Sequence, residues 1–349
     1  MKTTTPQKLT IPFNQVIDAL LDITQPFPAR FLHRLSDLPP QEVESLKSIW
    51  PSIDPNRRAA LMEDLEELAE NDTIICFDDI ARFALDDSDM RVRATALRIL
   101  WENDDAKLIP IYIKMMKEDQ EAFVRASAAT ALGIFVYTGE LEEISPVLKK
   151  TVVDNLIFVL NGNEEALVRR RALESLGYSG RKAVSGFIQS AFDSGNSDWM
   201  ASALFAMGRS SDDAWEETVV SMIDHEEVDV QLEAVRAAGQ LGLGSAVEPM
   251  LELLENAEEM DEEVRAAVIW ALSQIGGEEA VKALENLLDE IEDEEEAEYI
   301  EEALENLVFN QGLANVDIFN LSADDEDIKP EAGEHGQAKS NDRKSHKRN

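Results

Sequence analysis

The chain has 349 residues, 44% of them hydrophobic and 30% charged, which is enough for a sizeable core but longer than one compact core favours. Asp and Glu number 71 against 32 Lys and Arg, so the formal net charge of -39 argues against nucleic acid and anionic membranes as partners, because their phosphates would be repelled. The single cysteine, Cys76, excludes a disulfide framework or a paired-thiol metal site. Its apolar neighbours predict a buried, inert thiol.

Residues 1–38 are expected to form an N-terminal helical cap, with one short amphipathic helix at "FNQVIDALLD" and a link broken by prolines. The first residues lack the apolar stretch of a secretory leader, and no run approaches the roughly 18 apolar residues of a membrane span. We therefore expect a cytoplasmic protein. Residues 39–71 predict a loose helix pair that begins the main domain.

From residue 92 onward a pattern recurs: an apolar anchor that Arg usually follows, a small or apolar residue at offset +4, Ala at +7, and apolar residues at +8 and +11. The anchors stand at 92, 124, 168, 199, 230 and 264, at intervals of 32, 44, 31, 31 and 34. A degenerate copy follows at "AEYIEEALENL". The long interval falls at "YTGELEEISP", residues 137–146, which we interpret as an inserted loop.

A second apolar helix lies between successive anchors, as in "LIPIYIKMMKE" and "AVKALENLLDEI". A helix pair of this size cannot bury its apolar face alone, so neighbouring pairs must stack. The sequence thus predicts an all-α protein: a right-handed α-solenoid of about seven stacked antiparallel helix pairs over residues 39–310. Residues 311–349 have few apolar side chains and are expected to be a disordered tail, acidic at "ADDEDIKPE" and basic from Lys339 to Arg348. The short segment "VDIFNL" is either a solvated part of this tail or a docking element.

The motif D-x-x-V-R-x-x-A-x-x-A-L-x-x-I-G, with Asp261, Val264, Arg265, Ala271 and Gly276 in place, resembles HEAT repeats, in particular the short type found in phycobilisome-lyase-related proteins. The resemblance covers about residues 76–309. It implies the fold and the location of the motif helices on a concave surface, but says little about activity, because such repeats serve many roles.

Convergent catalytic groups are scarce in the sequence. Deoxyhypusine hydroxylase is built of similar repeats around paired His-Glu motifs, but here only His225-Glu226 forms such a pair, and it lies in a turn. The Asp/Glu clusters "LDDSDMR", "RSSDDAW", "EEMDEE" and "DEIEDEEEAE" lack calcium-loop spacing and fall at helix starts, where they are interpreted as caps. No phosphate loop or nucleophile motif is present. We therefore expect no enzyme activity, no metal and no cofactor.

Arginine recurs at the second motif position, in Arg93, Arg125, Arg169 and Arg265, where the resemblance implies ion pairs with acidic groups of adjacent repeats. Eight side chains are predicted to point into the concave surface. One of them is Glu233, and the other seven are the candidate partner-binding residues: Arg98, Arg171, Phe205, Arg209, Arg236, Trp270 and Gln274. Arg and aromatic side chains are typical anchors of protein interfaces. The alternative for Phe205 and Trp270 is packing against the next repeat.

The resulting hypothesis is a non-catalytic scaffold or adaptor, monomeric by itself, whose concave surface binds another protein, with an acidic segment as one possible ligand. The alternative is a subunit of an enzyme such as a bilin lyase, which attaches chromophores with similar repeats. A third interpretation, a HEAT-like DNA glycosylase, requires a cationic groove that the net charge disfavours.

Overall fold

The computed structural model describes residues 11–72, 74–255, 260–291 and 293–315. Every regular element within these ranges is a helix, and no strand occurs in them. The described chain begins with α1 (Phe13–Leu21), the 3-10 helix η1 (Ala29–Leu35), and a pair formed by α2 (Pro40–Ile49) and α3 (Pro55–Asn71), with η2 (Trp50–Ser52) between them. The helix pair expected at 39–71 is therefore present.

Seven further helix pairs follow α3 within the described residues. The first helices of these pairs are α4 (Asp78–Ala84), α6 (Leu108–Glu118), α9 (Pro146–Leu160), α11 (Ala183–Phe192), α13 (Glu216–Val220), α15 (Val247–Glu255) and α17 (Glu278–Glu290). The second helices are α5 (Met90–Ile99), α7 (Ala122–Ala131), α10 (Ala166–Leu176), α12 (Ser197–Arg209), α14 (Val228–Leu241), α16 (Glu262–Ile275) and α18 (Glu294–Asn315). Short 3-10 helices precede α13 and α15: η3 (Asp213–Trp215) and η4 (Gly244–Ala246).

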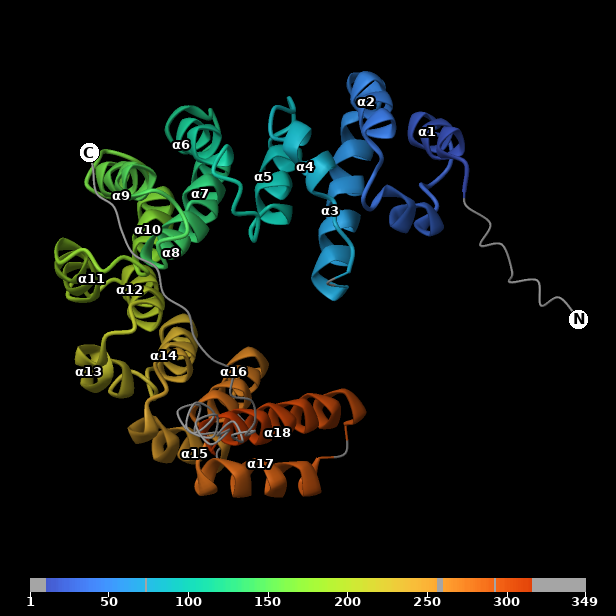
Figure 1. Cartoon of the computed structure of the whole chain (residues 1–349). Coiled ribbons are helices and arrows are strands. Elements are labelled where there is room, and N and C mark those ends of the chain that lie inside the picture. The colour runs from blue at the N-terminus through green and yellow to red at the C-terminus, as the bar shows by residue number, and fades with distance from the viewer. Residues whose placement is uncertain (1–10, 73, 256–259, 292, 316–349) are drawn as a thin grey trace, which may run out of the picture.

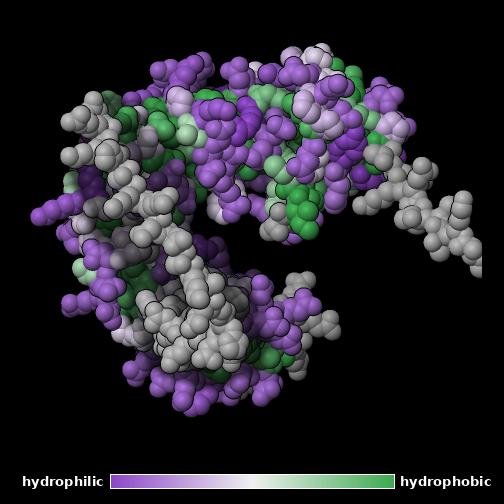
Figure 2. All heavy atoms as spheres, viewed as in Figure 1, coloured by the Kyte–Doolittle hydropathy of each residue, from purple (hydrophilic) through white to green (hydrophobic). Residues whose placement is uncertain are grey.

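The helix pairs form an arc, with the second helices and α3 along its inner side and the first helices from α6 onward outside (Figure 1). Each second helix contacts its own partner and the second helix of the next pair. The apolar core runs continuously from Val16 to Leu307, whereas the outline of the arc is mostly hydrophilic (Figure 2). The all-α solenoid with about seven repeats is confirmed.

Acidic and polar side chains begin the helices, as the clusters predict. Asp89 accepts the backbone N–H of Arg91, and Asp261 accepts those of Glu263 and Val264. In the two other clusters, Asp212 and Asp293 accept backbone N–H groups at the starts of η3 and α18. These carboxylates satisfy amides that have no partner inside the helix and lie at the positive end of its dipole. The capping interpretation is confirmed at all four clusters.

Small residues at motif offset +9 bring the inner helices together. A Cβ atom on Gly177 would lie 2.7 Å from the carbonyl oxygen of Ala206, and one on Gly239 would lie 2.9 Å from Cα of Ala271. These approaches are too close for any side chain, so the glycines allow backbone contact between α10 and α12 and between α14 and α16. The repeat pattern therefore reflects the need for close backbone packing between neighbouring helices as well as the burial of apolar side chains.

The long interval between the anchors at 124 and 168 is helical, so the predicted loop at residues 137–146 is wrong. Helix α8 (Gly133–Glu140) follows α7 after a break at Leu132, and only the turn from Leu141 to Ser145 remains outside helices. The extra residues thus add a helix between α7 and α9. By length and composition the stretch Ala122–Glu140 could span a membrane, but most of it is buried in the solenoid, as in the core helix of a soluble protein.

Near the C-terminus, α18 continues to Asn315. The first residues of the predicted tail, 311–315, are therefore helical, because the last turns of α18 extend beyond the repeat motif. The remaining tail, residues 316–349, with "VDIFNL" and the acidic and basic segments, lies outside the described residues.

Candidate functional site

The arginines at the second motif position connect neighbouring repeats. Arg93 forms an ion pair with Asp119 at 2.7 Å, and Arg125 forms one with Glu164 at 3.0 Å. Both guanidinium groups also donate to backbone carbonyls of the turn before their own helix. Each arginine therefore ties its own turn to the turn of the following repeat, which is a structural role.

Two further members of this row show what the position requires. Arg265 pairs with Glu296 at 2.5 Å. Arg169 instead donates from Nε to the carbonyl of Leu160, and its guanidinium lies 5.3 Å from the ring centroid of Trp199. The predicted pairing with acidic groups of adjacent repeats thus holds for Arg93, Arg125 and Arg265, while Arg169 uses a carbonyl and an aromatic ring.

Arg58 on α3 is a member of this row that the sequence pattern missed. Its side chain is 5% exposed and pairs with Asp87, which is 2% exposed, at 2.8 Å. The indole N–H of Trp50 donates to the same carboxylate at 2.6 Å, and Arg58 also donates to the carbonyl of Ile53 at 2.7 Å. A usable signal exists: Arg58 stands four residues after its N-cap, Asp54, as Arg93 does after Asp89.

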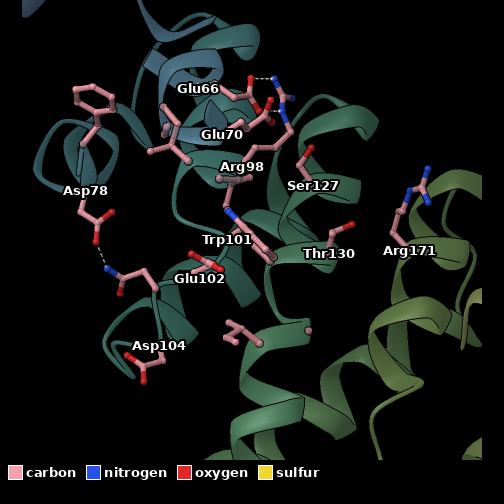
Figure 3. A pocket seen from close by; sticks show the side chains of 18 of the residues that line it. Glu66, Glu70, Asp78, Arg98, Trp101, Glu102, Asp104, Ser127, Thr130 and Arg171 are labelled. Atoms are coloured by element: carbon pink, nitrogen blue, oxygen red, sulfur yellow. Dashed lines mark hydrogen bonds and ion pairs between the residues drawn. The ribbon is translucent and has the colours of Figure 1, made fainter. Parts of the chain in front are cut away.

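Arg98, the first of the predicted concave-surface residues, is not a free cation. Its guanidinium donates two hydrogen bonds to the carboxylate of Glu66 on α3 (Figure 3). Glu66 and the nearby Glu70 both raise the pKa of Arg98, chiefly through the hydrogen bonds to Glu66. The positive charge of Arg98 is therefore balanced within the protein.

Arg171 and Arg209 belong to one polar and aromatic cluster on α10 and α12. Glu174 is buried and accepts from Arg171 at 2.6 Å and from the hydroxyl of Ser202 at 2.7 Å. The Arg209 guanidinium lies 4.0 Å from the ring centroid of Phe205 and 4.7 Å from that of Tyr178. Burial lowers the pKa of Arg209. Phe205 thus serves as one of two aromatic faces against which a half-buried cation lies.

Arg236 on α14 is also paired. It contacts Glu233 at 3.0 Å and Glu263 of the next repeat at 3.1 Å. Burial raises the pKa of the Glu233 carboxyl, the Arg236 guanidinium lowers it, and the Glu174 carboxylate raises it further. One oxygen of Glu233 is buried and has no hydrogen-bond partner among the described residues. This carboxylate is therefore held in an unfavourable environment for its charged form.

The other predicted residues on α16 divide between packing and exposure. Trp270 is half-buried, and its ring occupies the space beside Gly239, where an added Cβ would meet it at 2.7 Å. Gln274 is exposed and donates to the hydroxyl of Ser273. Trp270 thus packs against α14, whereas Gln274 faces solvent.

The concave surface carries a groove in its N-terminal half. The groove, of about 1100 Å³, extends from α3 across α5 and α7 to α10. Three aromatic side chains that line it are unusually exposed: Trp101 at 64%, Phe123 at 49% and Tyr137 at 44%. Arg98, Arg171 and Arg209 also line this groove, so three of the predicted residues share it. Arg236, Trp270 and Gln274 lie outside it, further along the arc.

Trp101 was not predicted, although the repeat contains a signal for it. It occupies motif offset +9 after Val92, where four other repeats place glycine: Gly133, Gly177, Gly208 and Gly239. An indole cannot fit into the backbone contact that these glycines allow. The side chain instead projects into the groove, toward α7 with Ser127 and Thr130 (Figure 3).

Three acidic side chains line the same part of the groove as Trp101. Glu70 lies near the end of α3, Glu102 directly follows Trp101, and Asp104 comes two residues later, with its carboxylate farther from the indole (Figure 3). Asp78, also on the groove, accepts a hydrogen bond from the Asn103 side chain. Arg171 stands on the opposite wall, on α10. The groove therefore has an acidic wall on one side and a paired arginine on the other.

Cys76 lies at the edge of this groove and is exposed, so the predicted burial is wrong. The run "TIICF" ends in the connection between α3 and α4. There the side chain of Phe77 is buried in the apolar core, whereas that of Cys76 is not. Partial desolvation nevertheless raises the pKa of the Cys76 thiol, with the nearby Asp78 contributing in both directions. Within the described ranges, no group of three or more His, Cys, Asp or Glu side chains is placed to hold a metal ion.

A stack of antiparallel helix pairs with a grooved inner surface defines the chain as an α-solenoid. The family model of HEAT repeats matches residues 79–159 and 216–305. These two segments therefore consist of HEAT repeats, and the expected resemblance to HEAT repeats is confirmed. No curated protein sequence matches it.

Three solved structures that this chain resembles are a bacterial protein, a bacterial protein complex and a human enzyme. YibA of Escherichia coli is 16% identical, with 80% of this chain and 96% of that chain covered and a TM-score of 0.41. The CpcE–CpcF complex of phycocyanin lyase from Nostoc is 19% identical, with 66% and 94% covered and a TM-score of 0.44. Human deoxyhypusine hydroxylase in complex with glycerol is 17% identical, with 75% and 95% covered and a TM-score of 0.33.

Proposed function

We propose that this protein is a non-catalytic scaffold that binds another protein in the groove between α3 and α10. The observation that carries the proposal is the gathering of Trp101, Phe123 and Tyr137, each more than two-fifths exposed, in one hollow of the concave surface. Apolar side chains of this size seldom stay exposed together unless they contact a ligand. Aromatic residues in a pocket are also the typical anchors of protein interfaces.

The groove narrows the set of residues first predicted to bind. Arg209 and Phe205 hold each other within the protein, and Arg98 is balanced by Glu66. Arg171 keeps part of its guanidinium exposed on the groove and remains a proposed contact. Arg236, Trp270 and Gln274 are proposed contacts only for a partner that extends along the arc. The proposal retains a cytoplasmic, monomeric protein without a cofactor.

The test uses two variants matched in exposure. Trp101→Ala with Phe123→Ala removes the anchors from the groove, and Phe158→Ala removes a phenylalanine that is 68% exposed on α9. Wild type and both variants would be used for affinity capture from the native cytoplasm. We expect a partner that wild type and Phe158→Ala recover and the groove variant does not, since loss of central anchors costs about 2 kcal/mol or more.

The opposite outcomes are equally clear. Identical recovery by all three proteins would remove the groove from consideration. A pigment bound to the purified wild-type protein would favour the alternative of a bilin-lyase-like subunit.

A further inference from the structure

The charges beside Trp101 indicate what kind of segment the groove accepts. Glu102 and Asp104 carry no ion pair among the described residues, in contrast to Glu66, which Arg98 neutralises, and Asp105, which pairs with Arg82 at 3.1 Å. Glu102, which directly follows the exposed Trp101, and Asp104, farther along the same wall of the groove, thus remain available to an external cation. The arginines on the far wall do not compensate them, because Arg171 contacts Glu174 and Arg209 lies between two rings.

The ends of two helices add to this field. α3 ends at Asn71, next to Glu70, and α5 ends at Ile99, just before Trp101. The carboxyl end of a helix carries a partial negative charge that favours cations within the last turn. Because α3 and α5 run side by side along the inner surface, both negative ends meet the acidic wall of the groove (Figure 1, Figure 3).

Building on the proposed function, we propose that the groove binds a basic, apolar segment of a separate partner protein. A Lys or Arg side chain of that segment lies over the Trp101 indole and pairs with Glu102, and a second basic side chain pairs with Asp104 farther along the same wall. Its apolar side chains lie against Phe123 and Tyr137 on α7 and α8. Tryptophan is the best aromatic partner for a cation, and the neighbouring carboxylates supply the charge that a neutral ring lacks.

The proposed ligand is basic, whereas the sequence alone suggested an acidic ligand. The concave arginines suggested an acidic segment, but Arg98, Arg171 and Arg236 each have a carboxylate partner in the structure. An acidic segment would meet Glu70, Glu102 and Asp104, which line the groove together with Trp101. Repulsion there would act against binding.

The experiment measures fluorescence anisotropy of labelled synthetic peptides with the full-length chain. One peptide alternates Lys and Arg with Leu and Phe, a second has Glu in place of every basic residue, and a third has Ser in place of every apolar residue. We expect binding of the first peptide alone, weakened by added salt because exposed charges are screened.

Three variants locate the binding. Trp101→Ala is expected to weaken the first peptide about tenfold, and Glu102→Gln with Asp104→Asn about threefold to tenfold, by removing the anchor or the charge without changing the fold. The matched control, Asp213→Asn with Glu217→Gln, removes two acidic groups at η3 and α13 and is expected to leave binding unchanged.

The outcomes separate this inference from the function on which it rests. If the Glu peptide binds wild type and Trp101→Ala abolishes that binding, the groove is a docking surface but its specificity for basic segments is overturned. Binding of the basic peptide that is equal in wild type and both groove variants would overturn the groove itself. Failure of the basic peptide to bind any form of the protein would also overturn the inference.

The basic end of the same chain is the rival occupant. Lys339, Arg343, Lys344, Lys347 and Arg348 lie there, outside the described residues, and a tethered segment competes at high effective concentration. A full-length variant with Arg343→Glu, Lys344→Glu, Lys347→Glu and Arg348→Glu tests this. Binding of the basic peptide by this variant alone would identify the chain's own end as the ligand and overturn the proposal of a separate partner.

Discussion

Replacing Arg58 by alanine would break the most deeply buried ion pair among the described residues. The Arg58 and Asp87 side chains are 5% and 2% exposed, and two nitrogens of the guanidinium contact the carboxylate, at 2.8 and 3.1 Å. Without Arg58, the Asp87 carboxylate keeps its hydrogen bonds from the Trp50 indole, the backbone N–H of Asp89 and, at 3.5 Å, the hydroxyl of Ser88, all of them uncharged donors. The charge then remains buried and uncompensated.

The expected cost of Arg58→Ala is about 3–5 kcal/mol of unfolding free energy, the range for removing one partner of a buried pair. The loss falls on the contact between the α2–α3 pair and the turn before α5, because Arg58 also donates to the carbonyls of Trp50 and Ile53. The control is Lys150→Ala, which removes an exposed ion pair with Asp154 on α9. That change should cost less than about 1 kcal/mol.

Urea unfolding followed by far-UV circular dichroism would measure both variants, with hydrogen exchange locating the region that opens. Repeat arrays can unfold in parts, so exchange in α1–α3 is the more specific measurement. The double variant Arg58→Met, Asp87→Ala should recover much of the loss, because no charge is left buried. A loss for Arg58→Ala no larger than that for Lys150→Ala would refute the reasoning.

Two further predictions follow from single side chains. Gly177→Ala should destabilise the fold by about 1–3 kcal/mol, because its Cβ would meet the Ala206 backbone, whereas Gly186→Ala, in α11 with nothing within 4 Å, should stabilise it by about 0.5–1 kcal/mol; equal thermal midpoints for the two variants would contradict this. Burial raises the pKa of Glu233 in the folded state, so the folded protein binds the proton more tightly and its stability falls as pH rises through the interval between the unfolded and folded pKa values. Glu233→Gln should therefore raise the thermal midpoint at neutral pH by a few degrees, an advantage that shrinks as the pH is lowered through that interval; a gain that does not change with pH would point to another cause.

Much of the architecture is predictable because the same pattern of apolar and small residues recurs in each repeat. Anchors such as Val124 and Val264, with alanine at fixed offsets, mark the helix faces that must be buried, and stacking follows because a single pair cannot bury them. The same logic identifies the acidic caps, since Asp89 and Asp261 stand where free backbone amides need acceptors. Local chemistry is sufficient for these features.

Two segments were predicted wrongly because their structure depends on contacts that the local sequence does not specify. Residues 133–140 form a helix although they interrupt the repeat, because their apolar side chains, such as Phe135 and Val136, are buried between neighbouring helices. Cys76 is exposed although its neighbours are apolar, since Phe77 is buried in the core and Ile75 packs partly against it while the thiol between them faces outward. In both cases the position of other repeats in space determines the outcome.

For the candidate site, the sequence by itself determined which residue types the repeats place on the inner side: arginines at regular offsets, and a tryptophan at a position that four other repeats give to glycine. Only the tertiary structure decided which of these charges are free. Partners such as Glu66 with Arg98 lie 32 residues apart, so their pairing depends on the stacking of successive repeats. The sequence does not distinguish a charged residue that is paired from one that is not. The acidic character of the groove near Trp101 is therefore visible only in the assembled solenoid.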